Sequence, residues 1–457
     1  MNLKKLQAAI QGKVFSDEET LQEVAYDFGH MTVKMPKAVV VPASSQDVQS
    51  VIRLACQEGW SVTPRGAGHS QGGQSLSDGG ILLDLSELNE LGQFEADSLW
   101  AEAGCQWNDV VQKTLERGLV PPVLTSNLNV TIGGTLSSGG FGATSHHHGD
   151  QSDHIEELEV VTGEGHLVRC SPAENPELFS SSLAGLGQFS IITRARLKLR
   201  TSSERVRTYF LLYDRLDHLM ADQEVLIKGD RFQFLQAWCS PCLQGFQHEG
   251  EIRIPITEWF FPLHLSVEYG GTAPWDEAKL EGLRFYRRIH VEDSSFAEFL
   301  QRPEPVFSQW RQSGAWNLAH PWMEILLPWK KAAAYIAGVL KSIPPAVLPG
   351  GQVILWPYRR RRAQASLLQE PPGDLIMGFG VQPSVSRQSL PMTLALLNKA
   401  SQIGMDLGGK RILTGWIGFD QAQWQSHFGA SWFRIRECKR FYDPHNILNP
   451  GFIPFEL

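Results

Sequence analysis

The chain has 457 residues, more than one hydrophobic core usually organises, so at least two lobes are expected. Hydrophobic residues make up 42% and charged residues 20%, which is typical of a globular protein, and no apolar run is long enough to span a bilayer. The dispersed net charge of −8 gives no basic footprint, so neither a nucleic-acid nor a membrane partner is expected. Six cysteines are too few for a disulfide scaffold, and together with the charged N-terminal residues they favour a cytoplasmic location.

The first lobe begins with a β-α-β pattern after a polar lead-in segment, residues 1–34. Strands are predicted over residues 38–42 and 60–62. Between them, apolar residues at helical spacing from 48 to 55 predict a helix that ends near Gly59. A further apolar run at 81–85 predicts the next strand, so residues 63–80 form the connection between two strands.

That connection contains Pro64-Arg-Gly-Ala-Gly-His-Ser70. Gly66 and Gly68 can adopt positive φ and turn their backbone N–H groups into one concavity, which suits a cofactor diphosphate. His69 lies at its edge, where a neutral imidazole is a competent nucleophile or ligand. A Gly-x-Gly sequence is also common in plain turns, so the spacing alone leaves both interpretations open.

A second glycine-rich stretch, residues 124–140, is almost free of charge and rich in hydroxyl groups. Such a segment fits against a large polar ligand, with glycines allowing close approach and Ser and Thr donating hydrogen bonds. The alternative is a flexible linker. The apolar residues Leu128, Val130, Ile132 and Leu136 are interleaved through the stretch and favour the ligand-contact interpretation.

Near residue 200 glycine becomes rarer and aromatic residues more frequent, which predicts a second lobe from 201 to about 415. Helical patterns occur in this lobe over residues 291–310 and 332–340, and a late helix is predicted over 431–441.

Three other motifs have plain interpretations. Trp238-Cys-Ser-Pro-Cys242 mimics a thioredoxin motif, but Gly245 disfavours the helix that such a motif needs. His146-His-His148 has no Cys or carboxylate at ligand spacing, so no metal site is expected. The basic run Arg359–Arg362 is interpreted as a solvated edge, with the hypothesis that one or two of Arg359 to Arg361 hold an anionic substrate group.

Several segments together resemble those of a known class, namely Arg65-Gly-Ala-Gly-His-Ser70 with Gln74, residues 128–138, 186–194 and 315–322, and the C-terminal residues 442–451. The sequence resembles flavoproteins of the vanillyl-alcohol-oxidase class, which have a p-cresol-methylhydroxylase-type (PCMH-type) FAD domain. Within that class it is most similar to the cytokinin dehydrogenases. The resemblance implies an α+β, two-lobe FAD-binding fold. It implies a PCMH-type domain over residues 1–200 with its core at 34–200, a mixed-sheet substrate or cap domain over 201–415, and a C-terminal segment, 416–457, that returns to the FAD domain.

The resemblance also implies that FAD is attached covalently through a ring nitrogen of His69. A second, cysteinyl link is not expected, because Ser126-Asn-Leu128 stands where some members of the class carry the cysteine. The cofactor-binding residues implied are Pro64, Arg65, Gly66, Ala67, Gly68, His69, Ser70, Gln74, Thr131, Gly133, Gly134, Ser137, Phe141, Ile192 and Asn449.

The substrate side departs from the family pattern. Ser126 stands where cytokinin dehydrogenases place an active-site aspartate, and a hydroxyl cannot replace that base near neutral pH. Glu292, matched more loosely to a family glutamate, is the candidate proton acceptor. The expected reaction moves hydride from a substrate C–H next to nitrogen to FAD, with oxygen or a quinone-like molecule as electron acceptor. The alternatives are a covalent-flavin alcohol, sugar or lactone oxidase and a flavin-bound protein without turnover.

Overall fold

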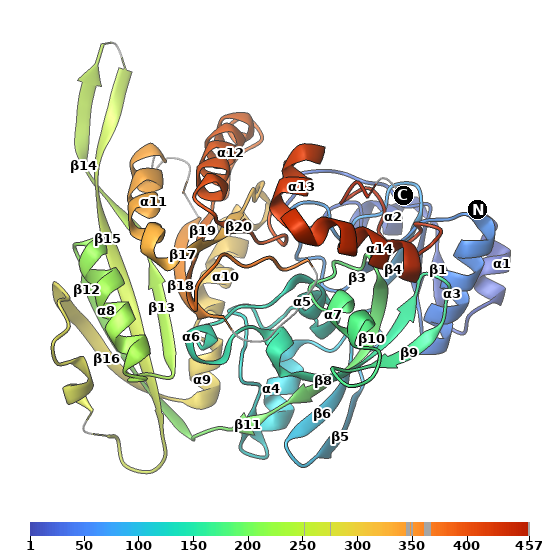
Figure 1. Ribbon diagram of the computed structural model, residues 1–457, viewed down its shortest axis with the longest axis horizontal. Helices are drawn as coiled ribbons and strands as arrows, with labels where there is room; N and C mark the ends of the chain where they lie inside the picture. The colour runs from blue at the N-terminus through green and yellow to red at the C-terminus, as the bar shows by residue number, and fades with distance from the viewer. Residues whose placement is uncertain (251, 275, 344–347, 349–350, 361–366, 456–457) are drawn as a thin grey trace.

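The structure, a computed structural model, describes every residue except 251, 275, 344–347, 349–350, 361–366 and 456–457. The chain forms two lobes, with the N-terminal lobe at one end of the long axis and a large sheet at the other (Figure 1). Strands as far as residue 201 form the sheets of the first lobe, and strands between residues 205 and 411 form the sheet of the second, here called the cap lobe.

The first sheet of the N-terminal lobe has the order β1-β2-β4-β3. Strands β2, β3 and β4 are parallel because helix α3 crosses from β2 to β3. Helix α3 ends at Gly59, whose φ of 66° is the left-handed conformation that glycine adopts without strain. The elements are α1 (Leu3–Ala8), β1 (Lys13–Phe15), α2 (Glu18–Glu23), β2 (Ala38–Val41), α3 (Ser45–Glu58), β3 (Val62–Arg65) and β4 (Ile81–Asp84).

The second sheet is antiparallel, with the order β5-β6-β10-β8-β9. Strands β7 and β11 form a separate two-stranded sheet. Its strands are β5 (Leu91–Glu95), β6 (Ser98–Glu102), β8 (Ile155–Thr162), β9 (Leu167–Cys170) and β10 (Ser190–Lys198), and the short pair is β7 (Leu119–Val120) and β11 (Arg200–Thr201). The helices between them are α4 (Trp107–Leu115), α5 (Ile132–Ser138), α6 (Ser145–His148), the 3-10 helix η1 (Gln151–His154) and α7 (Pro176–Ser182).

The cap lobe is built on one sheet of nine strands, ordered β16-β12-β15-β13-β18-β19-β17-β20, with β14 paired to β15. Helices α8, α11 and α12 pack against one face of this sheet. The strands are β12 (Arg205–Tyr213), β13 (Phe234–Trp238), β14 (Ser240–Glu249), β15 (Ile252–Tyr269), β16 (Arg287–Ser295), β17 (Met323–Pro328), β18 (Gln352–Arg359), β19 (Leu375–Gln382) and β20 (Lys410–Arg411). The helices are α8 (Leu216–Lys228), η2 (Glu277–Leu280), α9 (Phe296–Gln301), α10 (Glu304–Gln312), η3 (Ala315–Asn317), α11 (Trp329–Ser342) and α12 (Leu390–Asp406).

The helical pattern predicted from residue 291 onward is wrong at its start. Residues as far as Ser295 belong to the strand β16, which pairs along its length with β12. The helix begins only after Ser295, whose side chain forms a reciprocal capping box with Glu298. The local spacing is therefore overridden by long-range strand pairing, which a sequence window does not contain.

After β20 the chain returns to the N-terminal lobe through α13 (Gln421–Phe428), η5 (Gly429–Ser431) and α14 (Trp432–Tyr442). Lys439 of α14 is buried and donates hydrogen bonds to the carbonyl oxygens of Gln188 and Leu448, each 2.8 Å away, and to Asp443 at 2.7 Å. These bonds fix the C-terminal segment to the loop before β10.

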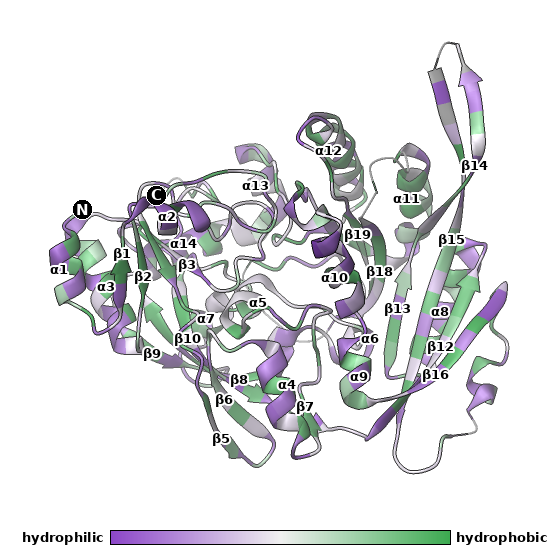
Figure 2. Ribbon diagram, turned by 180° about the vertical axis from the view of Figure 1, so that it is seen from behind, coloured by the Kyte–Doolittle hydropathy of each residue, from purple (hydrophilic) through white to green (hydrophobic). Residues whose placement is uncertain are grey.

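The hydropathy of the chain follows this arrangement. Hydrophobic residues are concentrated in the inner strands of both lobes, whereas β9, the outer part of β14 and the surface helices carry many hydrophilic residues (Figure 2). Of the helices in the part of the chain that the structure describes, none has both the length and the apolarity needed to cross a membrane.

Candidate active site

A cavity of about 1080 Å³ lies between the two lobes. Loops and α5 of the N-terminal lobe form one wall, and the cap sheet with α9 and α10 forms the other. Because side chains alternate along a strand, the side chains that face the cavity from β12, β13 and β18 are spaced mainly two residues apart. The residues contributed in this way include Thr208 and Phe210 of β12, Gln236 and Trp238 of β13, and Gln352, Ile354 and Trp356 of β18.

The loop after β3 forms the cofactor-side wall. Gly68 has φ 66°, as expected, whereas Gly66 does not adopt positive φ, which corrects the prediction for that residue. Gly66 is instead needed for close approach, because a Cβ there would lie 2.0 Å from Thr131 Oγ1. Among the described residues, the backbone N–H groups of residues 66–70 find no acceptor. They are available to an anion such as a diphosphate.

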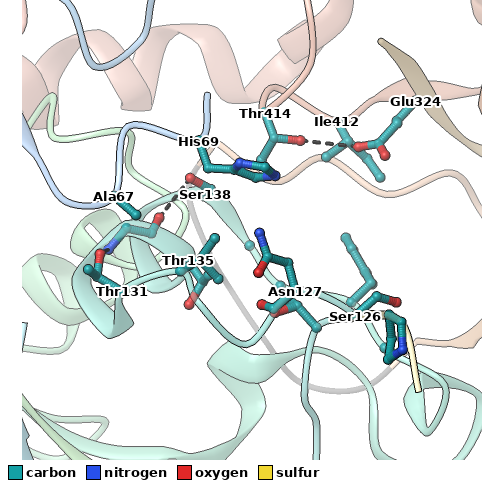
Figure 3. Close-up of a pocket in the computed structure, with 18 of the residues that line it drawn as sticks. Ala67, His69, Ser126, Asn127, Thr131, Thr135, Ser138, Glu324, Ile412 and Thr414 are labelled. Atoms are coloured by element: carbon teal, nitrogen blue, oxygen red, sulfur yellow. Dashed lines mark hydrogen bonds between the residues drawn. The ribbon is translucent and has the colours of Figure 1, made fainter. Parts of the chain in front are cut away.

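His69 lies on this loop and lines the cavity, between Thr131 on one side and Glu324 on the other (Figure 3). Its ring stacks on Phe28 with the ring centroids 4.2 Å apart and lies edge-on to Trp322. Burial, reinforced by the charge of His320, lowers the pKa of His69 to about 4. The imidazole is therefore neutral at neutral pH, and a ring nitrogen keeps a lone pair for bond formation.

The N-terminal segment, interpreted from the sequence as a polar lead-in, supports this loop. Asp27 accepts hydrogen bonds from Ser70 Oγ at 2.9 Å and from Gly73 N at 2.7 Å, and Phe28 N donates to Gly68 O. Burial raises the pKa of Asp27, and these two hydrogen bonds oppose the rise. Asp27 lies 43 residues before Ser70, so no local sequence signal indicates the contact.

The segment expected to lie against a ligand is partly helical. Thr131 caps α5 by accepting a hydrogen bond from Gly134 N at 3.3 Å. A Cβ on Gly133 would lie 2.7 Å from Ala103 Cβ, so glycine lets α5 pack closely on the end of β6. The expected cofactor-binding residues that line the cavity are Pro64, Arg65, Gly66, Ala67, Gly68, His69, Ser70, Gln74, Thr131, Gly133, Gly134, Ser137, Phe141 and Ile192.

Asn449 is not among the residues that line the cavity and lies behind its wall. Its side-chain Nδ2 donates to the carbonyl oxygens of Gln74 and Leu186, at 2.9 and 2.8 Å, and its φ of 43° is left-handed. The structure therefore gives Asn449 a positioning contact with two cavity-lining loops.

The two residues expected to be catalytic, Ser126 and Glu292, line the cavity from different lobes. Ser126 precedes α5, and Glu292 lies on the edge strand β16 opposite Thr208. The Glu292 side chain is exposed. A solvated carboxylate at a sheet edge is less suited to act as a tuned base than one held away from water.

Sequence analysis missed Glu324, a carboxylate on β17 that lines the same cavity. Its Oε1 accepts from Gln382 Nε2 at 2.6 Å and its Oε2 from Thr414 Oγ1 at 3.2 Å (Figure 3). Burial raises the pKa of Glu324, against the effect of both hydrogen bonds and of Arg411. The carbonyl oxygen of Thr414, in the segment after β20, accepts from Gln74 Nε2 at 3.2 Å, so this segment also contacts the loop that carries His69. The only sequence feature that could have indicated Glu324 is its position as an acidic residue inside the apolar run of residues 323–327.

Neither Arg359 nor Arg360 of the basic run is among the residues that line the cavity, which disfavours the hypothesis that they hold an anionic substrate group. Arg360 Nε lies 2.8 Å from Glu370 Oε2, and Arg361 lies outside the described residues. Arg359 ends β18, and its neighbour Tyr358 is buried in the sheet.

The other two motifs also have structural roles. Cys239, between β13 and β14, is buried, Cys242, within β14, is exposed, and both are free thiols. His146 of α6 contacts the carbonyl oxygen of Phe232 through Nε2 at 3.1 Å. Within the described ranges, no group of His, Cys, Asp or Glu could hold a metal ion.

The cavity residues fit a flavin dinucleotide. One wall presents backbone N–H groups without acceptors for a diphosphate. The other presents the indole rings of Trp322 and Trp356, whose buried Nε1 donors have no hydrogen-bond partner within the described residues. These flat aromatic rings suit contact with a planar ring system.

Two family models match the chain. The FAD binding domain matches residues 36–171, and the family described as "Cytokinin dehydrogenase 1, FAD and cytokinin binding" matches residues 276–455. Cytokinin dehydrogenase 10 of Oryza sativa subsp. japonica is 31% identical, over 97% of this chain and 88% of its own length. An uncharacterized oxidoreductase, ORF5 in the fasciation locus of Rhodococcoides fascians, is also 31% identical, over 96% of this chain and 98% of its own length.

Among solved structures, 6-hydroxy-D-nicotine oxidase of Arthrobacter nicotinovorans superimposes with a TM-score of 0.71 over 96% of each chain, at 20% identity. The expected α+β, two-lobe PCMH-type fold is confirmed, and so is the expected use of FAD by an enzyme. The chain belongs to the cytokinin dehydrogenase family of FAD-dependent oxidoreductases.

Proposed function

We propose that FAD is held covalently through His69 and that the holoenzyme oxidises an amine at the C–H bond next to nitrogen. The observation that carries this proposal is the pairing of two features across one cavity: a neutral imidazole beside acceptor-free N–H groups, and the partly buried carboxylate of Glu324. FAD, when bound, supplies the two-electron acceptor for the hydride.

The residues of the chain bind and orient both reactants. The N–H groups of residues 66–70 and the α5 wall would hold the dinucleotide. His69 would fix the position of the ring system, because its imidazole is itself clamped between the loop and Phe28. The cap wall, with the aromatic side chains of Phe210, Trp238 and Trp356, would exclude water from the substrate.

Glu324 would take the proton. As hydride leaves the carbon, the substrate nitrogen loses its N–H proton to the carboxylate, and the product is an imine. Gln382 and Thr414 hold the carboxylate in place by donating to its two oxygens. Ser126 does not compete for this role, since its hydroxyl is not a base near neutral pH. Glu324 thus replaces Glu292 as our candidate for the proton acceptor.

Two measurements on the purified protein test the proposal. Under anaerobic conditions, isopentenyladenine is expected to bleach the flavin absorption, while simple alcohols leave it unchanged. After acid denaturation the yellow colour is expected to stay with the polypeptide, whereas the His69→Ala variant releases it. Free flavin from the wild-type protein would overturn the covalent link, and an oxidised flavin after mixing with amines would overturn the reaction.

Ser126 favours a second candidate, an alcohol, sugar or lactone oxidase on the same cofactor domain, because such substrates do not require the missing aspartate. If alcohols bleach the flavin and amines do not, the protein is an oxidase of this second kind. If no substrate bleaches the flavin, it is a flavin-bound protein without turnover. Oxygen or a quinone-like molecule stays the expected acceptor. A cytoplasmic location also stays a prediction, with which the six free cysteines are consistent.

A further inference from the structure

Arg302 lies immediately after α9 and lines the substrate side of the cavity. It also lines a small adjoining cavity of about 30 Å³, together with Thr125, Ser126 and Gln236. The guanidinium therefore lies where the loop before α5 meets the cap sheet, next to the position at which the family aspartate is replaced by Ser126.

Within the described residues, the partners of this guanidinium are all neutral. Arg302 Nη1 donates to the carbonyl oxygen of Phe299 at 2.7 Å, and Nη2 donates to Gln236 Oε1 at 2.7 Å. The guanidinium carbon also lies 3.9 Å from the centroid of the Phe299 ring. No carboxylate among the described residues forms an ion pair with it. These contacts orient the side chain but leave its charge uncompensated.

Even a partly buried charge without a counter-ion is costly, so its presence calls for an explanation. Burial, with no opposing acidic group, lowers the pKa of Arg302 only to about 10, and the side chain stays charged at neutral pH. Its charge also helps burial to lower the pKa of His264, the strand partner of Gln236, to about 4. His264 is therefore neutral and supplies no second charge.

Three carboxylates line this end of the cavity, Glu292, Asp293 and Glu298; among the described residues none of them forms an ion pair with Arg302, and the last two have other partners. Asp293 binds Arg207, with Oδ2 2.7 Å from Nη2. Glu298 accepts from Ser295 N at 2.8 Å in the capping box of α9. By comparison, Arg200 of β11 is paired directly with a carboxylate of the cap lobe, since its Nη2 lies 2.5 Å from Glu268 Oε1 of β15. The missing counter-charge of Arg302 is thus not supplied by the neighbouring acids.

We propose that Arg302 binds a carboxylate group of the substrate, so that the natural substrate is an amine that carries one negative charge. The guanidinium has N–H donors beyond the two that the protein uses, which suits paired hydrogen bonds to a planar carboxylate. The hydroxyl groups of Thr125 and Ser126 line the same space. A doubly charged phosphate fits less well, because the other arginine lining the cavity in the described residues, Arg65, belongs to the cofactor loop. This inference rests on the proposed function and names its substrate class.

Titration of the oxidised holoenzyme with benzoate, followed by the change in the flavin absorption spectrum, tests the subsite directly. Benzamide is the neutral probe of the same shape. We expect the wild-type protein to bind benzoate well and benzamide poorly. In the Arg302→Gln variant the affinity for benzoate is expected to fall by about tenfold or more. Arg302→Lys keeps the charge and is expected to retain part of the affinity. Arg360→Gln, which removes a paired arginine outside the cavity lining, is expected to bind both probes like the wild type.

Unchanged benzoate affinity in Arg302→Gln, or equal affinity of the wild type for the two probes, would overturn the proposal. If Arg302→Gln does not fold, the comparison of the two probes on the wild type and on Arg302→Lys still decides. The binding measurement needs no turnover, so its result is separate from that of the bleaching test. Equilibrium dialysis with labelled benzoate gives the same answer should the purified protein lack flavin.

Discussion

The two walls of the cavity are built in different ways. The cofactor wall acts mainly through its backbone: the N–H groups of residues 66–70 have no acceptor in the described part of the chain, and its glycines leave no room for a larger residue. The cap wall acts through side chains such as Glu324 and Arg302, which stand on or beside strands of one large sheet. A required backbone conformation or a close approach restricts the residue types that a position allows. The identity of a side chain on a strand is restricted only by the residues that it contacts across the cavity. The first wall can therefore be read in the sequence and the second cannot.

The largest effect is expected for the substitution Gly66→Ala on the cofactor wall. A Cβ at Gly66 would lie 2.0 Å from Thr131 Oγ1, so either the loop or the start of α5 must move. We expect the purified variant to lose most of its FAD, measured as the ratio of flavin to protein absorbance.

Gly270→Ala is the matched control, because nothing lies within 4 Å of a Cβ there. It is expected to keep the wild-type flavin content. Full flavin content in Gly66→Ala would show that the backbone of this loop does not depend on the absence of a side chain.

The extent to which the site could be predicted follows the same division. The strand, glycine turn and histidine around His69 were visible because they are contiguous, and fourteen of the expected cofactor residues line the cavity. The N-terminal Asp27 and Phe28 were missed, since they reach the loop through contacts that span about 40 residues. Glycine at 66 was recognised for a positive φ that it does not have, when the real constraint is the approach of Thr131.

The functional residues of the cap wall could not be predicted from the sequence. Glu292 was chosen by alignment, but strand pairing places it at a sheet edge with its side chain exposed. Glu324 gives only the weak signal of a charge within an apolar strand, and its importance comes from Gln382 and Thr414, which lie far from it in sequence. Arg302 carries no local motif at all. Partners of this kind are brought together by the register of the nine-stranded sheet, which no sequence window specifies.

The next prediction concerns what holds the cofactor wall in place from behind. Lys439→Met removes a buried ammonium group that bonds to Gln188, Leu448 and Asp443, and it leaves the Asp443 carboxylate buried without its counter-charge. We expect a loss of about 3–5 kcal/mol in the free energy of unfolding, measured by urea denaturation.

The exposed pair Lys113 and Glu116 provides the control, with Lys113 52% exposed. Lys113→Met is expected to change the unfolding free energy by about 0–1 kcal/mol. Equal effects of the two variants would mean that the C-terminal segment contributes no more to the first lobe than a surface ion pair.

On the cap wall, Glu324→Gln keeps the shape of the side chain and removes its basicity. We expect the rate of flavin reduction by an amine to fall by about 100-fold, measured by anaerobic stopped-flow absorption. Glu292→Gln is the control and is expected to react like the wild type. In the wild type the carboxylate must be ionised to accept a proton, and its raised pKa means that the rate falls as the pH drops through that pKa. A slow Glu292→Gln beside a fast Glu324→Gln would restore the sequence-based assignment.

The last prediction concerns the contact between the two lobes, where a change of one pH unit is expected to have a small effect. Asp150, at the start of η1, is buried, and the hydroxyl of Tyr358 on the cap strand β18 lies 3.5 Å from its Oδ2. Burial, with the nearby charge of Asp153, raises the pKa of Asp150 to about 7. Between its unfolded pKa and this value the folded protein holds a proton that the unfolded chain releases, so the contribution of Asp150 to stability falls as the pH rises.

Asp150→Asn removes this titration while keeping an oxygen that accepts from Ser152 N. We expect the variant to gain stability relative to the wild type as the pH rises from about 4 to about 7, by on the order of 1 kcal/mol per pH unit. Urea unfolding of both proteins at several pH values measures the difference, in which the contributions of the other titrating groups cancel. A difference that does not change with pH would mean that Asp150 is already ionised in the folded protein, and that the contact between the lobes includes a buried negative charge.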